Sequence, residues 1–260
     1  MTDAGPEHLN EEGTAIFERC RVNIRLACAF QLAGLFIVPL RHARSQEVGT
    51  GTVQGTITLS KSDDVAEEEH RRALLNRYTP DALEYGILAD PKSWRPYRLA
   101  ETTVVYLERE SPGSAGPYTP PRVHPVLDQK GLRFHPQVLP VLVGTTVDFP
   151  NGDVVFHNVF SYSQPKEFDL GRYPMGDSRS VTFDRPGIVR VYCDIHSDMN
   201  ATILVLNNPY FATPADDGTY ILHDVPDGKY RMVVWHGRDV LFRRAILVKA
   251  GETTTVNIAY

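Results

Sequence analysis

Cysteine is scarce in this chain, and basic side chains are outnumbered by acidic ones. Its 260 residues include three cysteines, and 27 lysines and arginines face 32 aspartates and glutamates, for a formal net charge of −5. This charge balance lacks the electrostatic footprint of a nucleic-acid-binding protein. The sequence also lacks a Gly-x-Ser-x-Gly motif, a phosphate-binding loop and an internal repeat. These absences argue against nucleic-acid binding, against nucleophile-elbow and phosphate-loop chemistry, and against a repeat architecture.

Long hydrophobic runs are also rare. One largely apolar stretch of 15 residues runs from Leu26 to Leu40 and follows three arginines between positions 19 and 25. A membrane-spanning helix needs about 20 apolar residues, so this pattern predicts a secretory signal. We therefore assign 1–44 to a signal peptide, with an uncleaved N-terminal anchor as the alternative. We expect a periplasmic or extracellular protein that touches a membrane only through such an anchor.

Export makes the last cysteine informative. Cys20 and Cys28 lie within the predicted signal, so the exported protein keeps Cys193 alone. An odd cysteine in an exported protein indicates a free reactive thiol, an intermolecular disulfide or a metal ligand. The metal ligand is favoured by neighbouring donors that, with the cysteine, make up the ligand set of a type 1 (blue) copper site: two imidazoles, one thiolate and a weak axial thioether. These candidate ligands are His157, Cys193, His196 and Met199.

Each candidate ligand also has an ordinary structural explanation. Cys193 could be a small buried apolar residue, Met199 could fill a core, and the histidines could be structural. Their conjunction in a loop that is otherwise polar favours the metal site. Zinc suits the set poorly, because structural zinc prefers paired cysteines and histidines or carboxylates. Multicopper oxidases need several histidine pairs, and no His-x-His occurs; a dinuclear copper site would need a second cysteine in the loop. Asn158 is either a residue that orients a copper thiolate or a turn asparagine.

Alternating apolar and polar residues dominate the chain beyond residue 50 and predict an all-β protein. The short strands, separated by turn residues, indicate sandwiches or barrels. A weak helix is expected over 63–78, and the Ser/Gly/Pro-rich stretch 111–117 predicts a linker. The expected strands are 53–59, 103–107, a hairpin over 123–134 that turns at 128–131, 138–143, 145–149, 154–160, 179–183, 188–193, 201–206, 211–213, 220–222, 230–235, 245–248 and 254–258.

The region 123–207 resembles the cupredoxins. Its Cys-x-x-His-x-x-Met spacing is that of amicyanin, in which the upstream ligand is likewise followed by Asn-Val. The stretches Phe149–Ser161 and Phe168–Gly171 are similar to those of exported bacterial proteins described as methylamine-utilisation or plastocyanin-like. The resemblance implies a Greek-key β-sandwich that binds one type 1 copper. The ligands that it implies are His157, Cys193, His196 and Met199.

The flanks resemble a second family, the carboxypeptidase-regulatory (transthyretin-like) β-sandwiches. The stretch from Asp217 to Tyr230 is similar to their Asp-Gly-x-Tyr and Pro-x-Gly-x-Tyr pattern. The two strands expected before the linker at 111–117 cannot cover a core alone. The five strands expected after residue 209 cannot do so either. We therefore expect 45–117 and 209–260 to join into one seven-stranded sandwich, with the cupredoxin domain 118–208 inserted between its second and third strands. A simple tandem of three parts is the alternative.

The nested arrangement makes a packing prediction. Ile57 and Val105 should lie against Val233 and Ile246 and not against the copper domain. Burying both sets of strands together removes exposed sheet edges, which are otherwise aggregation hazards.

The cupredoxin resemblance implies an exported carrier of single electrons that serves a redox partner protein. It transforms no substrate, so we do not expect an enzyme. Asp198 departs from the family pattern, in which a bulky or imidazole residue usually precedes the methionine, and this puts an apolar docking rim in doubt. Two alternatives are a copper-binding or copper-delivery protein without redox turnover, and a metal-free cell-surface β-sandwich that acts as a binding module.

Overall fold

The computed structural model describes residues 49–59, 97–110 and 118–260, and nearly every element in them is a β-strand. The predicted signal over 1–44, the helix over 63–78 and the linker over 111–117 lie outside the described residues. The all-β class is confirmed, with one short helix, α2 (Leu99–Thr102), before the second strand. No helix in the described ranges is long and apolar enough to cross a membrane. The strands are β1 (Thr50–Thr58), β2 (Thr103–Arg109), β3 (Asp128–Gln129), β4 (Phe134–His135), β5 (Val138–Leu142), β6 (Thr145–Pro150), β7 (His157–Ser163), β8 (Lys166–Tyr173), β9 (Ser178–Phe183), β10 (Gly187–Tyr192), β11 (Asn200–Leu206), β12 (Phe211–Ala212), β13 (Thr219–Pro226), β14 (Gly228–His236), β15 (Asp239–Val248), β16 (Thr253–Thr255) and β17 (Ile258–Ala259).

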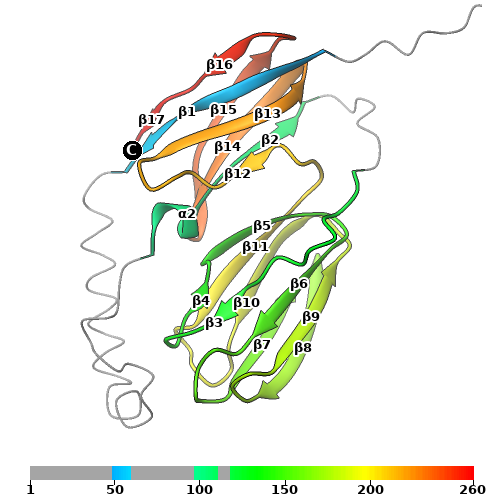
Figure 1. Cartoon of the computed structure of the whole chain (residues 1–260), viewed down its shortest axis with the longest axis vertical. Helices are drawn as coiled ribbons and strands as arrows, with labels where there is room; N and C mark the ends of the chain where they lie inside the picture. Colours follow the sequence, from blue (N-terminus) through cyan, green and yellow to red (C-terminus); the bar gives the residue numbers. More distant parts are fainter. Residues whose placement is uncertain (1–48, 60–96, 111–117) are drawn as a thin grey trace, which may run out of the picture. The chain divides into compact units, whose positions relative to one another are not determined.

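Strands β3–β11 form the central sandwich. One sheet has the strand order β5-β11-β10-β7-β8, in which β5 and β11 run parallel and the other pairs are antiparallel. The antiparallel pairs β6–β9 and β3–β4 provide the other layer (Figure 1). Alternate residues of both layers, such as Phe149, Phe183, Val191 and Ile203, are fully buried in one core. Period-two alternation therefore places one face of each strand in this core.

The remaining strands form the flanking sandwich, which combines two distant segments of the chain. One four-stranded sheet has β1 between β13 and β16, with β17 also paired to β1, and the other has the order β12-β2-β14-β15 (Figure 1). Strand β2 ends at Arg109, and its neighbour β12 begins at Phe211. A second core lies between these sheets and includes Ile57, Val105 and Ile246. The two sheets hold eight strands, one more than the seven expected from the sequence.

Val233 does not pack where we expected. It shares a third buried cluster with Val138 and Leu204 of the central sandwich, together with Val104 and Trp235. The cause is strand alternation: Met232 and Val234, on either side of Val233, face the core of the flanking sandwich, so Val233 must face the opposite way.

An arginine also connects the two sandwiches. The Arg190 guanidinium of β10 lies 5.2 Å from the ring centroid of Trp235 and donates to Thr202 Oγ1 at 2.9 Å. It also donates to the carbonyl of Arg238, beyond β14. The cation–π contact and the hydrogen bonds fix the position of this long side chain beside the apolar cluster.

The sequence prediction failed in three places of the central sandwich. Strand β8 was missed, because it is a polar edge strand whose burial alternates only weakly. Strand β7 begins at His157 instead of residue 154. The hairpin expected over 123–134 is reduced to two short strands, and its turn falls at Lys130–Arg133, two residues later than predicted.

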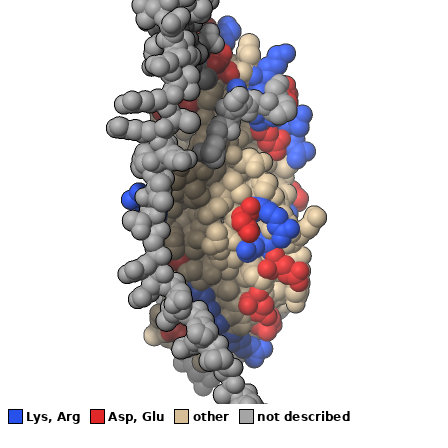
Figure 2. Space-filling view, turned by 90° about the vertical axis from the view of Figure 1, so that its right-hand side faces the viewer, with Lys and Arg blue, Asp and Glu red and all other residues tan. Residues whose placement is uncertain are grey.

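Charged residues are interspersed on the face shown in Figure 2, where basic and acidic side chains alternate with uncharged ones. This mixture agrees with the small net charge of the chain.

Candidate metal centre

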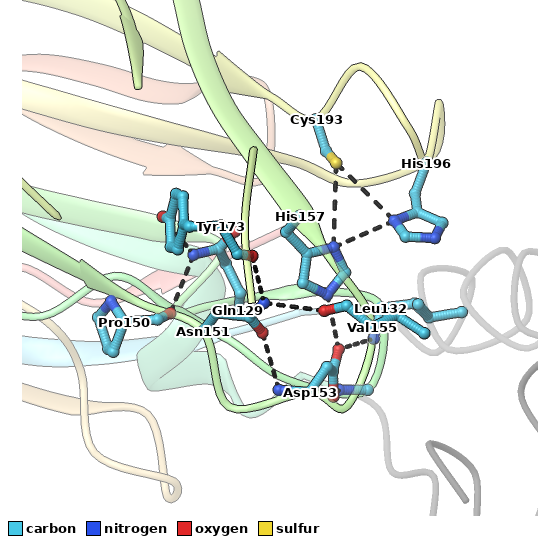
Figure 3. A network of polar contacts seen from close by, with 11 residues as sticks. Gln129, Leu132, Pro150, Asn151, Asp153, Val155, His157, Tyr173, Cys193 and His196 are labelled. Carbon is cyan, nitrogen blue, oxygen red and sulfur yellow. Dashed lines mark hydrogen bonds and ion pairs between the residues drawn. The ribbon is translucent and has the colours of Figure 1, made fainter. Parts of the chain in front are cut away.

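Two neighbouring strands bring the candidate donors together. His157 is the first residue of β7, and Cys193 directly follows the last residue of β10. The two strands are neighbours in the five-stranded sheet, where Tyr192 pairs with Phe160. His196 lies three residues after Cys193, in the loop that leads to β11. Donors that are 36 residues apart in the sequence therefore meet at one end of the central sandwich (Figure 3).

The donor atoms have the spacing of ligands around a single ion. The Nδ1 atoms of His157 and His196 are 3.1 Å apart, and Cys193 Sγ lies 3.9 Å and 3.8 Å from them (Figure 3). Ligand atoms that bind one ion at about 2.0 Å (nitrogen) and 2.3 Å (sulfur) in a trigonal arrangement are themselves about 3.5–3.7 Å apart. In the part of the chain that the structure describes, this is the one group of three His, Cys, Asp or Glu donors that could hold a metal.

Met199 closes the loop. Its amide donates to the carbonyl of His196 at 3.0 Å, and its carbonyl accepts from the Cys193 amide at 3.3 Å. The side chain is buried in the same core cluster as Cys193. Met175, the alternative thioether near the site in sequence, is 56% exposed. The backbone therefore holds Met199 close to the converging donors, and its role as an axial ligand stays a prediction.

The environment of Cys193 favours the thiolate. Burial raises the pKa of this thiol, but hydrogen bonds from His157 and His196 and from the backbone amides of Asn158 and His196 outweigh burial and lower the pKa to about 5. For His157, burial lowers the pKa, whereas hydrogen bonds to Asp153 and Cys193 raise it and prevail. Thiolate and imidazolium thus stabilise each other, and a cation that binds between them would displace the proton.

Asn158 ties β7 to the loop that carries the donors. Its side-chain Oδ1 accepts from the Asp194 amide at 3.4 Å, and its Nδ2 donates to Asp169 Oδ1 at 2.7 Å. Asp169 also accepts from the Gly171 amide at 2.8 Å. Both the backbone and the side chain of Asn158 therefore contact the Cys193 loop. That Asn158 orients a copper thiolate stays a prediction.

Asp153 was missed by the sequence analysis. It is 4% exposed, and its Oδ2 lies 2.9 Å from His157 Nε2, on the side of the ring that faces away from Cys193 (Figure 3). An acidic residue four positions before a candidate ligand, followed by the apolar run Val154–Phe156, was the signal that could have revealed it. Strand periodicity gave no reason to expect that this side chain turns inward, because 151–156 lie outside any strand.

The residues beside the two histidines are not only acidic. Phe156 and Ile195, which directly precede His157 and His196, are exposed apolar side chains. Asp194 is exposed as well and forms an ion pair with Arg172 at 3.3 Å. Asp198 therefore adds a carboxylate to a rim that still includes apolar residues.

Comparison with known proteins finds similarity only among solved structures. No protein-family model and no curated protein matches the sequence. The chain is similar to a copper-containing nitrite reductase from Thermus scotoductus (26% identity over 44% of this chain and 28% of that chain, TM-score 0.33). It is similar to a purple cupredoxin from Nitrosopumilus maritimus (31% identity, 27% of this chain and 79% of that chain, TM-score 0.26). It is also similar to a reduced variant of amicyanin (23% identity, 39% of this chain and 98% of that chain, TM-score 0.31).

Cupredoxins are therefore among the structures that this chain resembles over part of its length. Their TM-scores are all below 0.5, so the interpretation of the site rests on its own geometry. The transthyretin-like resemblance of the flanking sandwich stays a prediction.

Proposed function

We propose that this chain binds one type 1 copper ion and carries single electrons. His157, Cys193 and His196 would hold the ion in its plane, and Met199 would be the weak axial ligand. The observation that carries the proposal is the convergence of two imidazole nitrogens on one buried sulfur whose pKa is lowered to about 5. Bound copper would supply the one-electron chemistry, and the chain would hold its ligands in place.

The scaffold suits an electron carrier because it restricts movement of the ligands. His157 is fixed at the start of β7, Cys193 directly follows β10, and the loop between Cys193 and Met199 is closed by two backbone hydrogen bonds. The Nδ1 atoms of His157 and His196 lie 3.9 Å and 3.8 Å from the sulfur. Ligands that are held in this way move little when the charge of the ion changes, which favours fast electron exchange.

Zinc fits the donor group less well. Among the described residues, the donor group contains no carboxylate. Asp153 approaches the other nitrogen of His157. A single thiolate with two imidazoles and a nearby thioether favours copper over a structural zinc ion.

The localisation of the chain, its redox partner and its lack of enzymatic activity are also proposals. We propose an exported, periplasmic or extracellular protein, with a membrane contact only if the N-terminal segment stays as an anchor. A redox partner protein would dock on the rim that includes Phe156 and Ile195, since small apolar areas near a cofactor suit transient contacts. The chain would transform no substrate and would not be an enzyme.

A copper-delivery protein is the alternative that the site itself allows, because thiolate and thioether donors also select Cu(I). The metal-free binding module is the alternative suggested by the flanking sandwich. A single experiment distinguishes the electron carrier, the copper-delivery protein and the binding module. The fragment 45–260 is purified, one equivalent of Cu(II) is added, and visible and electron-spin resonance spectra are recorded before and after reduction.

An electron carrier should show an intense blue or green band at one copper per chain, lost on reduction and regained on reoxidation. Binding of colourless Cu(I) alone, without an oxidised coloured form, would favour copper delivery. The binding module predicts no copper binding at all.

We also propose that the central sandwich is an independent copper domain, 118–208, nested within a flanking domain made of 45–117 and 209–260. The sheet pairing of β2 with β12 and β14 supports these boundaries. The solubility of the fragment 45–207 and copper binding by the fragment 118–208 test them.

A further inference from the structure

A buried carboxylate lies behind the donor group. Asp153 belongs to the loop between β6 and β7, and its side chain is 4% exposed. Its Oδ1 accepts from the Gly131 amide at 2.7 Å, and its Oδ2 accepts from the Leu132 amide at 2.9 Å. The third partner is His157 Nε2, 2.9 Å from Oδ2 (Figure 3). Three N–H partners offset much of the cost of burying a carboxylate, and such charge-assisted hydrogen bonds are the strong ones.

The β3–β4 hairpin is shaped around this carboxylate. Gly131 and Leu132 have φ values of 65° and 58°, and the Lys130 amide donates to the Arg133 carbonyl at 2.9 Å across the turn. Two central residues with positive φ define the type I′ turn, which glycine adopts readily and leucine does not. In this conformation the two central amides both point at Asp153. The unfavourable backbone conformation of Leu132 therefore occurs in a turn whose two successive N–H groups bind the Asp153 carboxylate.

A second side chain keeps Asp153 from turning away. Asn151 Oδ1 accepts from the Asp153 amide at 2.9 Å, and Asn151 Nδ2 donates to the carbonyls of Val155 at 2.8 Å and Tyr173 at 3.0 Å (Figure 3). The loop is therefore braced on both sides of Asp153. Asp153 does not join the converging donors, because it contacts Nε2 of His157, whereas Nδ1 faces Cys193.

We propose that Asp153 is a positioning residue that decides which nitrogen of His157 binds the metal and lowers the reduction potential of the bound ion. By accepting a hydrogen bond from Nε2–H, the carboxylate keeps the proton of the neutral ring on Nε2 and leaves the lone pair of Nδ1 directed at Cys193 and His196. Outer hydrogen bonds of this kind fix the ring orientation and the tautomer of metal-binding histidines. The proposal rests on the proposed copper function for its effect on the potential, but the choice of nitrogen is a property of the protein without metal.

The negative charge of Asp153 determines the direction in which we expect the reduction potential to change. A negative charge held in a buried site close to His157 stabilises a doubly charged ion more than a singly charged one. Asp153→Asn keeps the size of the side chain and removes that charge. We expect the affinity for Cu(I) relative to Cu(II) to increase about tenfold, which for a one-electron couple corresponds to a potential higher by about 59 mV.

The first test compares the reduction potentials of copper-loaded wild-type protein, Asp153→Asn and Asp177→Asn in the fragment 45–260. Asp177 is an exposed carboxylate of the same sandwich, so its variant controls for loss of one negative charge at the surface. A rise confined to Asp153→Asn, with one copper still bound, supports the proposal. Equal potentials in wild type and Asp153→Asn, or the same rise in both variants, would overturn it.

The second test needs neither a variant nor copper, so it stands even if Asp153→Asn does not fold. In metal-free wild-type protein with ¹⁵N-labelled histidine, at an alkaline pH where the ring is neutral, NMR reports which nitrogen of His157 carries the proton. We expect the proton on Nε2, in slow exchange with water. A proton on Nδ1 would refute the positioning role. Failure of wild-type protein to bind copper would instead refute the proposed function and leave this result unaffected.

Discussion

The Nδ1 atom of His157 lies 3.1 Å from the Nδ1 atom of His196, although the two are 39 positions apart in the sequence. Nitrogen atoms at this distance cannot both direct a lone pair at each other without cost, so a proton or another cation must lie between or beside them. Cys193 Sγ, less than 4 Å from each, is the natural counter-charge.

Removal of the thiolate should abolish the copper chromophore. We expect Cys193→Ser to lose the intense visible band while it keeps the far-ultraviolet circular dichroism of the wild type, because the alternating apolar residues of the strands hold the central core together. The check is a copper titration followed by visible spectroscopy. An unchanged band in Cys193→Ser would exclude Cys193 as the ligand.

Replacement of the axial candidate should keep copper bound. Met199→Leu removes a weak, long bond from a buried position, so we expect one copper per chain and a higher reduction potential. Methionine and leucine differ little in volume, so the free energy of unfolding should fall by less than about 1.5 kcal/mol. Met175→Leu, at an exposed position, is the matched control. If Met175→Leu shifts the spectrum and Met199→Leu does not, the axial sulfur is Met175.

The metal-free protein should lose stability as the solution becomes acidic. The folded-state pKa of Cys193 is about 5, whereas a free cysteine has a pKa of about 8.5. Because the folded pKa is the lower one, the thiolate contributes stability that is fully present above about pH 8.5 and is lost as the pH falls through 5.

The contribution of His157 has the opposite sign, because its folded-state pKa is raised. That contribution is fully present below about pH 6.5 and is lost as the pH rises through the folded value. Of these two groups, Cys193 alone changes stability between about pH 6.5 and 5, so the free energy of unfolding should fall across this interval. Urea unfolding of metal-free wild type and Cys193→Ser provides the measurement. The same acid dependence in both proteins would show that Cys193 is not its source.

Truncation should separate the two sandwiches. Ile57 and Val105 share a buried core with Tyr230, Met232 and Ile246, so a fragment 45–207 would expose the apolar faces of β1 and β2. We expect that fragment to aggregate, and the fragment 118–208 to fold and bind one copper. Size-exclusion chromatography and copper binding measure both. A fragment 45–207 that is as soluble and as cooperative in unfolding as 45–260 would favour the tandem arrangement.

A pair of adjacent valines tests the two faces of β14. Val233 and Val234 are both fully buried, but Val233 contacts the cluster shared with the central sandwich and Val234 lies in the flanking core. Each change to alanine removes two buried methyl groups and should cost about 1–3 kcal/mol in the free energy of unfolding. In the fragment 45–260, only Val233→Ala should also loosen the contact between the sandwiches, seen as faster amide hydrogen exchange at Val138 and Leu204. Equal exchange at these residues in both variants would contradict the assignment of the faces.

The sequence by itself determined the all-β class and most strand positions. Strand alternation is a local property with a period of two residues, so β6, β9, β10 and β11 could be placed from their own residues alone. The spacing of Cys193, His196 and Met199 is equally local, because a loop of seven residues between two neighbouring antiparallel strands keeps its members close.

Tertiary structure decided what depends on distant segments. Strand β8 was not predicted because an edge strand needs no apolar face of its own. Val233 lies outside its expected core because the two faces of β14 pack in two different buried clusters. Asp153 is the clearest case. Its burial is favourable only because the amides of Gly131 and Leu132, more than 20 residues earlier, converge on it from a turn with two positive φ values. A local pattern can place a carboxylate in a loop, but only the folded chain supplies the three N–H groups that allow it to be buried behind His157.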